Sequence, residues 1–206
     1  MSLVQRLVHD AKSMGVELTE PDAARLQQLL DELERWNRTY NLTAIAKRED
    51  MVTHHLLDSL AVNPELQGTT IADVGTGAGF PGLPLAVLNP ERRFTLIDSA
   101  GKKIRFVSHV AHALGLTNVE GLHARVESLR PETPFDTIVT RAFAPLPEML
   151  EKVAPLCGPK THVLAMKGKW PREEVAAIPV GWRVLRSREL IIPGLKESRC
   201  AIVLTR

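Results

Sequence analysis

A run of closely spaced glycines is the part of the sequence best suited to binding chemistry. Residues 73–82 read DVGTGAGFPG, and they follow a short apolar segment that is typical of a strand. Glycine lets a backbone turn sharply and lets a ligand approach without a clash against Cβ. A helix that begins after such a turn also presents free N–H groups. The stretch therefore predicts a ligand-binding turn formed by Asp73, Gly75, Gly77 and Gly79.

A single carboxylate follows this turn at a meaningful distance. Asp98 lies 19 residues after Gly79 and closes the apolar segment RFTLID, which is typical of a second strand. An acid at this point of an α/β fold accepts hydrogen bonds from the hydroxyls of an adenosine ribose. The turn and the acid together predict a cofactor that contains a nucleoside.

The identity of that cofactor depends on how the glycines are grouped. Gly77-x-Gly79-x-x-Gly82 matches the dinucleotide pattern formally, which is a weak signal by itself. Gly75-x-Gly77-x-Gly79, with Asp73 two residues upstream, matches the methyltransferase pattern better. Nicotinamide enzymes usually need a second mononucleotide half, but only about 140 residues remain for the whole sheet. S-adenosyl-L-methionine is therefore favoured, and a dinucleotide or a purely structural turn are the alternatives.

Strands and helices alternate from Thr70 onward, which predicts the sheet that positions these residues. The expected strands cover residues 69–75, 93–98, 118–124, 135–142 and 161–168, and the expected helices cover 102–114, 146–157 and 170–178. Alternation of this kind indicates a parallel sheet with helices on both faces. Residues 182–193 and 198–206 read as two consecutive strands, which indicates an antiparallel hairpin at or near one edge. We predict an α/β, Rossmann-like class I methyltransferase fold with a mostly parallel seven-stranded sheet.

The first 66 residues are predicted to form a helical extension before the methyltransferase domain of residues 67–206. Residues 26–36 place leucines and a tryptophan at helical spacing, and Thr19 with Asp22 resembles a capping box. A second helix is expected over residues 49–62. The intervening WNRTYNLTAI, residues 36–45, is rich in Asn and Thr and predicts a turn-bearing connector.

Charge and composition limit the class of protein. Residues 1–66 hold 7 Lys/Arg and 11 Asp/Glu, whereas residues 67–206 hold 19 and 13. A basic main domain fits a phosphate-bearing partner, although an ordinary solvated surface would look the same. No run of about 18 apolar residues predicts a membrane span, and Asp10 interrupts any signal peptide. Two cysteines without CxxC spacing fit a reducing compartment, so we expect a cytoplasmic protein.

Several segments taken together resemble one known family. WNRTYNLTAI, HHLLDSLAV, IADVGTGAGFPGLPLA, LIDSAGKKIRF, RVE, TRAFAPL and MKG occur in the order seen in the RsmG family, also called GidB. The similarity covers nearly the whole chain. That family methylates N7 of guanine 527 in the 530 loop of bacterial 16S rRNA. The resemblance implies S-adenosyl-L-methionine as methyl donor and 16S rRNA or the small ribosomal subunit as partner.

The resemblance also implies which residues contact the cofactor. Carried over position by position, the family's contacts fall on Gly75, Phe80, Val126, Glu127 and Arg141. The family often has Pro at the position of Ala78 and Leu at that of Phe80. Either departure suits a backbone contact or an apolar wall.

Guanine N7 carries an available lone pair, so its methylation needs no general base, and the sequence shows no obvious nucleophile–base pair. Catalysis would come from alignment and exclusion of water. Arg141 and Lys167 end predicted strands and are the candidate catalytic residues. Arg141 could instead only pair with Asp73 or Glu127, and Lys167 could be a solvated lysine.

Four residues are candidates for RNA contact: Arg125, Phe143, Lys167 and Arg199. Arginine suits RNA because its planar fork meets phosphate or stacks on a base. Phe143 could stack on a displaced guanine or simply pack after a core strand.

His54, His55 and Asp58 invite a metal hypothesis, because His54 and Asp58 share a helical face. No HExxH pattern or third ligand is evident, so a hydrogen-bond network beneath the cofactor site is favoured and no metal is expected.

Three other functions remain open from sequence. A small-molecule methyltransferase predicts a closed apolar pocket, whereas an RNA enzyme predicts an open basic approach around Arg125, Arg141, Lys167 and Arg199. A nicotinamide-dependent reductase and a nucleotide-binding adaptor without catalysis are the others. No extended coiled-coil pattern demands a dimer, so a monomer is expected.

Overall fold

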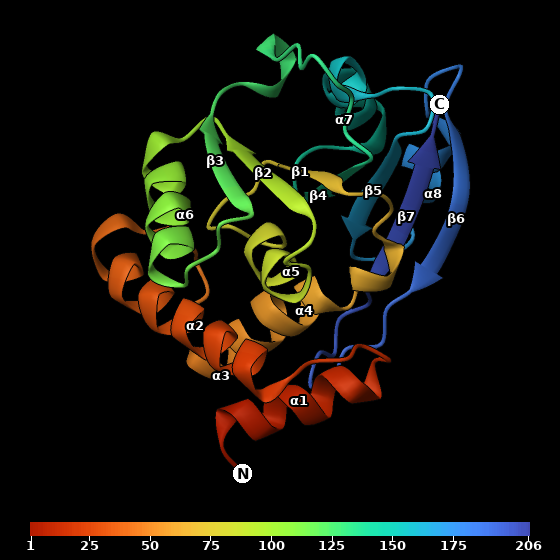
Figure 1. Ribbon diagram of the computed structural model, residues 1–206. Helices are drawn as coiled ribbons and strands as arrows, with labels where there is room; N and C mark the ends of the chain where they lie inside the picture. The colour runs from red at the N-terminus through yellow and green to blue at the C-terminus, as the bar shows by residue number, and fades with distance from the viewer.

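Seven strands form the central sheet of the computed structural model, which describes residues 1–206 (Figure 1). Their order across the sheet is β3-β2-β1-β4-β5-β7-β6. The strands are β1 (Thr70–Val74), β2 (Arg93–Asp98), β3 (Val119–His123), β4 (Thr137–Arg141), β5 (His162–Lys167), β6 (Arg183–Glu189) and β7 (Cys200–Thr205). β1 to β5 run parallel, and β7 runs antiparallel to both β5 and β6. The predicted fold is confirmed, with β7 inserted between β5 and the edge strand β6.

The strands are apolar because both faces of the sheet are covered. Ile71 of β1 belongs to one apolar core, and its neighbours Ala72 and Val74 belong to the core on the opposite face. Such strands read as nearly continuous apolar runs. β6 differs, since four of its seven residues are charged and most of it is exposed. Charge on an edge strand discourages pairing with another chain.

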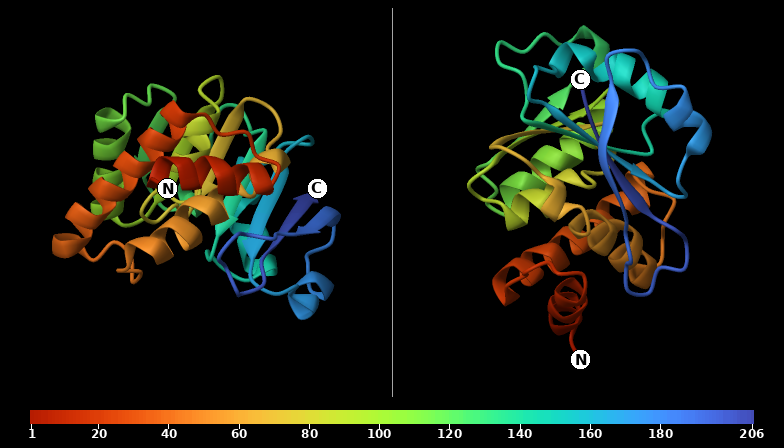
Figure 2. Two further views of the ribbon diagram at one scale, coloured as in Figure 1. Left: turned by 90° about the horizontal axis from the view of Figure 1, so that it is seen from below. Right: turned by 90° about the vertical axis from the view of Figure 1, so that its right-hand side faces the viewer.

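Helices cover the two faces as separate layers (Figure 2). On one face lie α5 (Gly82–Leu88) and α6 (Gly101–Ala113), which contact β2. On the other lies α7 (Leu146–Val153), which contacts α8 (Arg172–Ala176). Three short 3-10 turns complete the connections: η2 (Asn63–Glu65), η3 (Val126–Ser128) and η4 (Ala154–Leu156).

The N-terminal segment forms α1 (Leu3–Ser13), α2 (Glu20–Tyr40) and a composite helix. The composite helix runs through α3 (Arg48–Met51), a π-helical turn η1 (Val52–Leu57) and α4 (Asp58–Leu60). Thr19 caps α2 by accepting a hydrogen bond from the Asp22 N–H, as predicted.

The predicted connector over residues 36–45 is partly wrong, because α2 continues to Tyr40. Trp36 packs edge-on against Phe106 of α6, with ring centroids 5.6 Å apart, and this tertiary contact favours continued helix. The helix ends where Asn41 adopts a left-handed conformation, with φ 47°. Asparagine tolerates that conformation better than most residues.

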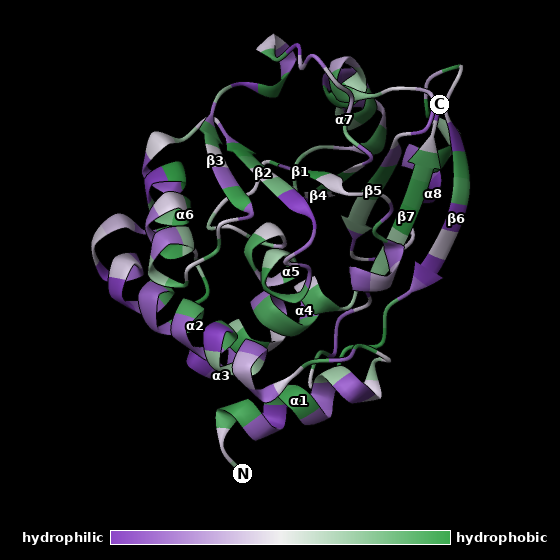
Figure 3. Ribbon diagram, viewed as in Figure 1, coloured by the Kyte–Doolittle hydropathy of each residue, from purple (hydrophilic) through white to green (hydrophobic).

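One apolar core joins the N-terminal helices to the sheet. It contains Leu7 of α1, Leu30 of α2 and Leu60 of α4 together with Leu96 and Val203 of the sheet. Figure 3 shows the apolar residues of these helices and strands among more polar ones. The shared core fixes η1 and α4 relative to the sheet. None of the helices combines the length and apolarity needed to cross a membrane.

Candidate active site

The glycine turn after β1 has the backbone that its sequence predicts. Gly75, Gly77 and Gly79 all have left-handed φ angles, of 71°, 61° and 87°. Asp73 is fully buried beneath the turn, where its Oδ2 accepts hydrogen bonds from Thr76 Oγ1 at 2.6 Å and Gly82 N–H at 2.8 Å. Burial raises the pKa of Asp73 to about 6. The carboxylate of Asp73 therefore holds the shape of the turn from below.

Asp98 at the end of β2 is tied to the same turn. Its Oδ2 accepts a hydrogen bond from the Gly77 N–H at 2.9 Å, and its Oδ1 accepts one from the Ala100 N–H at 2.8 Å. The Lys103 ammonium lies 3.7 Å from Oδ2. The two sequence features that predicted a nucleoside site thus meet at one place.

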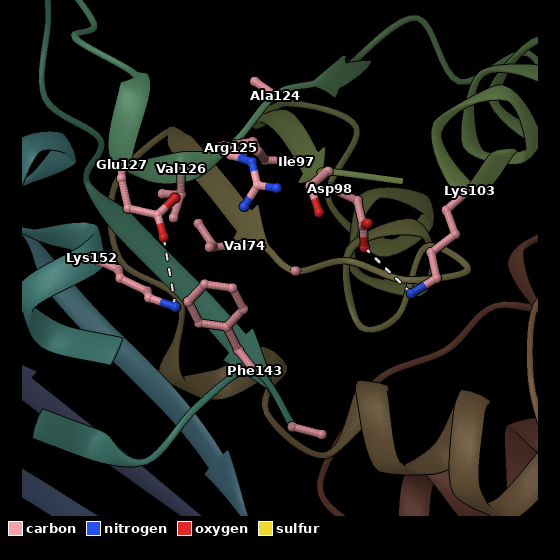
Figure 4. Close-up of a pocket in the computed structure, with 13 residues that line it drawn as sticks. Val74, Ile97, Asp98, Lys103, Ala124, Arg125, Val126, Glu127, Phe143 and Lys152 are labelled. Carbon is pink, nitrogen blue, oxygen red and sulfur yellow. Dashed lines mark ion pairs between the residues drawn. The ribbon is translucent and has the colours of Figure 1, made fainter. Parts of the chain in front are cut away.

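A cavity of about 270 Å³ opens beside this pair, and we name it the glycine-turn cavity (Figure 4). Its walls come from the ends of β1 and β2, from η3 and from the loop after β4. The residues that line it are Val74, Gly75, Ile97, Asp98, Ser99, Lys103, Ala124, Arg125, Val126, Glu127, Ala142, Phe143 and Lys152. Of the predicted cofactor contacts, it contains Gly75, Asp98, Val126 and Glu127.

The residues of this cavity fit an adenosyl group. The cavity holds the Asp98 carboxylate, a group that accepts hydrogen bonds as ribose hydroxyls require, and the apolar side chains of Ile97 and Val126, which are suited to a flat base. A Cβ built on Gly77 would meet nothing within 4 Å, so the backbone is open there to a ligand. A Cβ on Gly75 would lie 2.5 Å from the Phe143 ring, which explains why this position requires glycine.

Phe143 and Arg125, predicted as RNA contacts, both line the glycine-turn cavity. Lys152 lies 5.5 Å from the centroid of the Phe143 ring and 3.6 Å from Glu127 (Figure 4). This lysine, which sequence reasoning missed, reaches the cavity from α7. Nothing in its local sequence marks it out.

A second cavity adjoins the first, and we name it the Arg141 cavity. It has a volume of about 380 Å³. Its lining residues are Ile45, His54, His55, Asp58, Arg141, Ala142, Met166, Lys167, Gly168 and Arg199. Ala142 lines both cavities and has a left-handed φ of 51°, which is uncommon for a residue other than glycine. The backbone after β4 therefore turns sharply where the two cavities meet.

Strand ends bring the cations of the Arg141 cavity together. Arg141 is the last residue of β4, Lys167 is the last of β5, and Arg199 directly precedes the antiparallel β7. All three therefore reach the same edge of the sheet. The predicted catalytic pair Arg141 and Lys167 shares this cavity with Arg199, a predicted RNA contact.

The N-terminal composite helix holds Arg141 in place. Its Nη1 donates to the His54 carbonyl at 2.7 Å and to Asp58 Oδ2 at 3.1 Å. Its guanidinium carbon lies 5.7 Å from the centroid of the Phe80 ring. Arg141 thus pairs with Asp58 and not with Asp73 or Glu127, the two acids considered from sequence. Arg141 lines the Arg141 cavity, and the cofactor contact that the resemblance implies for it stays a prediction.

Asp58 is the acid around which the Arg141 cavity is organised; sequence reasoning placed it in a hydrogen-bond network beneath the cofactor site but did not predict its contact with Arg141. Its side chain is only 3% exposed and lies between two arginines. Oδ2 bonds to Arg141, whereas Oδ1 lies 3.3 Å from Nε of Arg199 and has no hydrogen-bond partner. The available signal was the spacing of Asp58 from His54, which sequence reasoning interpreted as a hydrogen-bond network without naming the two arginines as partners.

The side chains of His55 and Phe80 pack between the glycine turn and the composite helix. Their rings stack with centroids 4.6 Å apart, and His55 Nε2 lies 3.0 Å from Thr43 Oγ1. Burial, followed by the charges of Arg141 and His54, lowers the pKa of His55 to about 3. His55 is therefore neutral near pH 7. Phe80 is 2% exposed and supports His55, so its side chain lies away from the glycine-turn cavity.

His54, His55 and Asp58 are linked through Arg141, which donates to the His54 carbonyl and to Asp58 and lies 3.4 Å from His55 Nδ1. These residues line the Arg141 cavity, and the predicted place of the network beneath the cofactor stays a prediction. His54 Nδ1 lies 3.0 Å from the Asp50 carbonyl, and its Nε2 lies 3.8 Å from Glu197. The structure has no group of three or more His, Cys, Asp or Glu side chains placed to hold a metal ion. The π-helical turn matters here, because such turns often occur at functional sites.

Lys167 is held by the segment that follows β4 and by α8. Its ammonium donates to the Ala144 carbonyl at 3.0 Å and to Glu174 Oε2 at 2.8 Å. Its side chain is 17% exposed, so it is not a solvated surface lysine. Glu174 Oε2 also accepts the Leu146 N–H at 2.7 Å, which ties α8 to the start of α7.

Solved structures place the fold in a broad class. The chain is similar to a SAM dependent methyltransferase from Aquifex aeolicus, with a TM-score of 0.56 and 23% identity over 78% of this chain and 94% of that one. It is also similar to TrmN from Thermus thermophilus, with a TM-score of 0.56 and 22% identity over 72% of this chain and 47% of that one. Together with the strand order, these likenesses define a class I methyltransferase fold.

Sequence comparison gives the family. A family model described as rRNA small subunit methyltransferase G matches residues 22–203. A Ribosomal RNA small subunit methyltransferase G from Ectopseudomonas mendocina is 44% identical over 212 residues, covering 100% of this chain and 99% of the relative. One of the same name from Psychromonas ingrahamii is 40% identical over the full length of both chains. The chain therefore belongs to the rRNA small subunit methyltransferase G family.

Proposed function

We propose that this enzyme transfers a methyl group from S-adenosyl-L-methionine to N7 of a guanine in 16S rRNA, namely guanine 527 of the 530 loop. One observation carries the proposal: the glycine-turn cavity and the Arg141 cavity meet at Ala142. A cofactor in the first and a base in the second would be neighbours across that residue. Family membership supports the ribosomal substrate.

The cofactor would lie in the glycine-turn cavity. Asp98 would accept hydrogen bonds from the ribose, and Val126 with Ile97 would flank the adenine. S-adenosyl-L-methionine supplies a methyl group on a positively charged sulfur. The chain's own part is to hold the ribose and base so that this group faces the neighbouring cavity, since alignment lowers the barrier to an in-line displacement.

The target guanine would lie in the Arg141 cavity. Guanine presents two acceptors on one edge, O6 and N7. Donors from Arg141 or Lys167 would bind O6 and leave the N7 lone pair toward Ala142. No group has to remove a proton, and the neutral His55 supplies none.

Asp58 offsets part of the positive charge of the Arg141 cavity. Methylation at N7 makes the guanine ring cationic, so the cavity must not be strongly positive. Asp58 lies within 3.3 Å of both arginines and offsets part of their charge. Fixed charges placed where charge develops are a common source of catalytic stabilisation. We assign Asp58 as the positioning residue that keeps the two guanidinium groups apart and aligned.

The test is to map the modified nucleotide. The protein is incubated with labelled S-adenosyl-L-methionine and either small ribosomal subunits or bare 16S rRNA. We expect label on a single guanine at N7, in one or both substrates. Absence of label in both substrates, from a protein that still binds S-adenosylhomocysteine, would contradict the proposal.

We also propose that the enzyme acts as a monomer in the cytoplasm. The edge strand β6 carries charged residues, which disfavour pairing of two sheets. Light scattering on the purified protein should give the chain mass of 22.8 kDa. Twice that mass at micromolar concentration would contradict a monomer.

A further inference from the structure

A third cavity continues from the Arg141 cavity, and we name it the Trp170 cavity. It has a volume of about 260 Å³. Gly168 and Arg199 line both cavities, so the two are continuous along the segment that follows β5. Lys169, Trp170 and Arg188 complete the part of the wall that concerns us. Neither the family comparison nor the proposed reaction assigns this cavity a role.

An exposed aromatic ring is the first feature that calls for a ligand. Trp170 is 42% exposed, although it lies beside a cavity and its neighbours are polar. Removal of apolar surface from water is favourable, so a partner that covered the exposed part of this side chain would be stabilised there. The indole therefore offers a flat surface for stacking.

Fixed cations are the second feature. Arg188 donates from Nε to Glu65 Oε1 at 3.1 Å and from Nη2 to the Ala61 carbonyl at 2.8 Å, yet its side chain remains 43% exposed. Arg199 forms an ion pair with Asp58 at 3.3 Å, and its Nη1 donates to the Ser198 carbonyl at 3.0 Å. With Lys169, three cations line a cavity that holds one acid, Glu189. Glu65 and Asp58 offset part of the charge of the two arginines, so the cavity offers a phosphate the Lys169 ammonium and the exposed donors of guanidinium groups that are already oriented.

An aromatic platform beside fixed cations is the arrangement that binds single-stranded nucleic acid. Bases stack on the aromatic ring, and the cations track the phosphates. Sequence-specific RNA recognition uses unstacked bases in loops in the same manner. A target base drawn into the Arg141 cavity leaves its neighbour without a stacking partner, and that neighbour is one phosphate away.

We propose that the Trp170 cavity binds the nucleotide adjacent to the target guanine, with its base stacked on Trp170 and its phosphate bound by Lys169 and Arg188. The inference rests on the proposed function, because it needs the target base in the Arg141 cavity. It adds a substrate site that selects a flexible single-stranded loop over a duplex. Two adjacent bases that remain stacked in a duplex cannot enter the Arg141 cavity and the Trp170 cavity at the same time.

Methylation kinetics on 16S rRNA test this site. Stacking on an aromatic side chain contributes about 1–3 kcal/mol per base, so Trp170→Ala should raise KM for RNA by about 5- to 150-fold. Trp170→Phe keeps a stacking ring and should stay within about threefold of wild type. Affinity for S-adenosylhomocysteine should be unchanged in both. Tyr40→Ala is the matched control, since Tyr40 is 40% exposed and lines none of the three cavities.

Salt dependence tests the phosphate contact separately. Lys169→Ala should lower the slope of log affinity against log salt by about 1. Lys160→Ala is its control, because Lys160 precedes β5 and lies at the opposite end of that strand. An equal change of slope in both variants would mean that Lys169 adds only general charge.

Fluorescence of the intact protein gives a readout that does not depend on turnover. A short single-stranded RNA should quench tryptophan emission in wild type and much less in Trp170→Phe. If wild type methylates rRNA while Trp170→Ala has an unchanged KM and the quenching survives in Trp170→Phe, the site is wrong and the proposed function stands. If wild type methylates no rRNA, the proposed function fails, and quenching independent of Trp170 would then overturn the site as well.

Discussion

Asp98 has two tasks at once, because it anchors the glycine turn and faces the cavity. Its carboxylate accepts the Gly77 and Ala100 N–H groups, and oxygen lone pairs beyond these remain for a ligand. Since Asp98 also holds the glycine turn, the conformation of the turn and the binding of the ribose would depend on the same carboxylate. Loss of this side chain should therefore affect binding first.

We expect Asp98→Ala to weaken S-adenosylhomocysteine binding by about 1–3 kcal/mol, since buried hydrogen bonds to a charged acceptor are lost. Isothermal titration calorimetry measures this directly. Glu91→Gln serves as control, because Glu91 is exposed and outside the cavity. Equal affinity in Asp98→Ala and wild type would refute the ribose contact.

Asp58 pairs with two arginines and is not among the residues that line the glycine-turn cavity. Asp58→Asn keeps the shape of the side chain but removes the charge that aligns Arg141 and Arg199. We expect kcat on 16S rRNA to fall by about 100-fold, as misplaced groups at a reacting centre commonly cost this much. Affinity for S-adenosylhomocysteine should be retained. A parallel loss of cofactor affinity would show that Asp58 supports the whole site and not the base cavity alone.

At the scale of elements, the glycine turn shows how backbone form and packing act together. Gly75 has φ 71°, and a Cβ there would also meet the Phe143 ring. Gly15 has a nearly equal φ of 73° but nothing within 4 Å of a built Cβ. A comparison of substitutions at these two positions therefore distinguishes backbone strain from a steric clash with a neighbouring side chain.

Gly75→Ala should abolish measurable S-adenosylhomocysteine binding, because the added methyl group displaces Phe143 into the cavity. Gly15→Ala should cost about 1–2 kcal/mol of stability from strain alone and leave binding intact. Calorimetric titration and urea unfolding measure the two effects. If Gly75→Ala bound S-adenosylhomocysteine as tightly as wild type, the Phe143 ring would have to move away without narrowing the cavity, which would contradict this prediction.

The π-helical turn η1 makes folding sensitive to acid through His55. The pKa of His55 is about 3 in the folded protein because of burial and of Arg141, but about 6.5 in an unfolded chain. Between these values the unfolded chain binds more protons. The stabilisation is complete above pH 6.5 and is lost as pH falls toward 3.

His55→Gln should remove this dependence. Below pH 6.5 the free energy of unfolding of wild type should fall by up to about 1.4 kcal/mol per pH unit more than that of the variant. Urea unfolding of both proteins between pH 4.5 and 7.5 gives the difference. The other titrating groups are the same in both proteins, so the difference between the two profiles isolates His55. Parallel pH profiles would contradict a contribution of His55 to the pH dependence of stability.

At the scale of the whole molecule, the N-terminal helices and the sheet share one core. That core contains residues from Leu7 in α1 to Val203 in β7. Residues 1–66 are therefore part of the folding unit, and they also deliver Asp58 and His55 to the Arg141 cavity.

We expect thermal unfolding to be a single transition by calorimetry and by circular dichroism, because helices that share a core with the sheet lose their packing with it. A separate low-temperature transition of the helices would contradict this. Leu30→Ala gives a second test, because Leu30 is fully buried in the shared core. If helices and sheet unfold together, this substitution should lower the temperature of the single transition without splitting it in two.

The sequence alone predicted the features whose causes are local. A left-handed turn needs glycine at Gly75, Gly77 and Gly79, and alternating strand and helix patterns need no distant partner to be recognised. The alternation also predicted the parallel sheet, and Asp98 followed from its place at a strand end. The connector over residues 36–45 failed because Trp36 has a packing partner in α6 that the local sequence does not show.

Only the tertiary structure decided which side chains form the Arg141 cavity. Asp58 and Arg141 are 83 residues apart, and they meet because two packed layers bring α4 to the end of β4. The Phe80 side chain likewise stacks on His55 and is not among the residues that line the glycine-turn cavity. Backbone conformation depends on neighbours along the chain, whereas ion pairs between distant segments depend on how a shared apolar core places those segments.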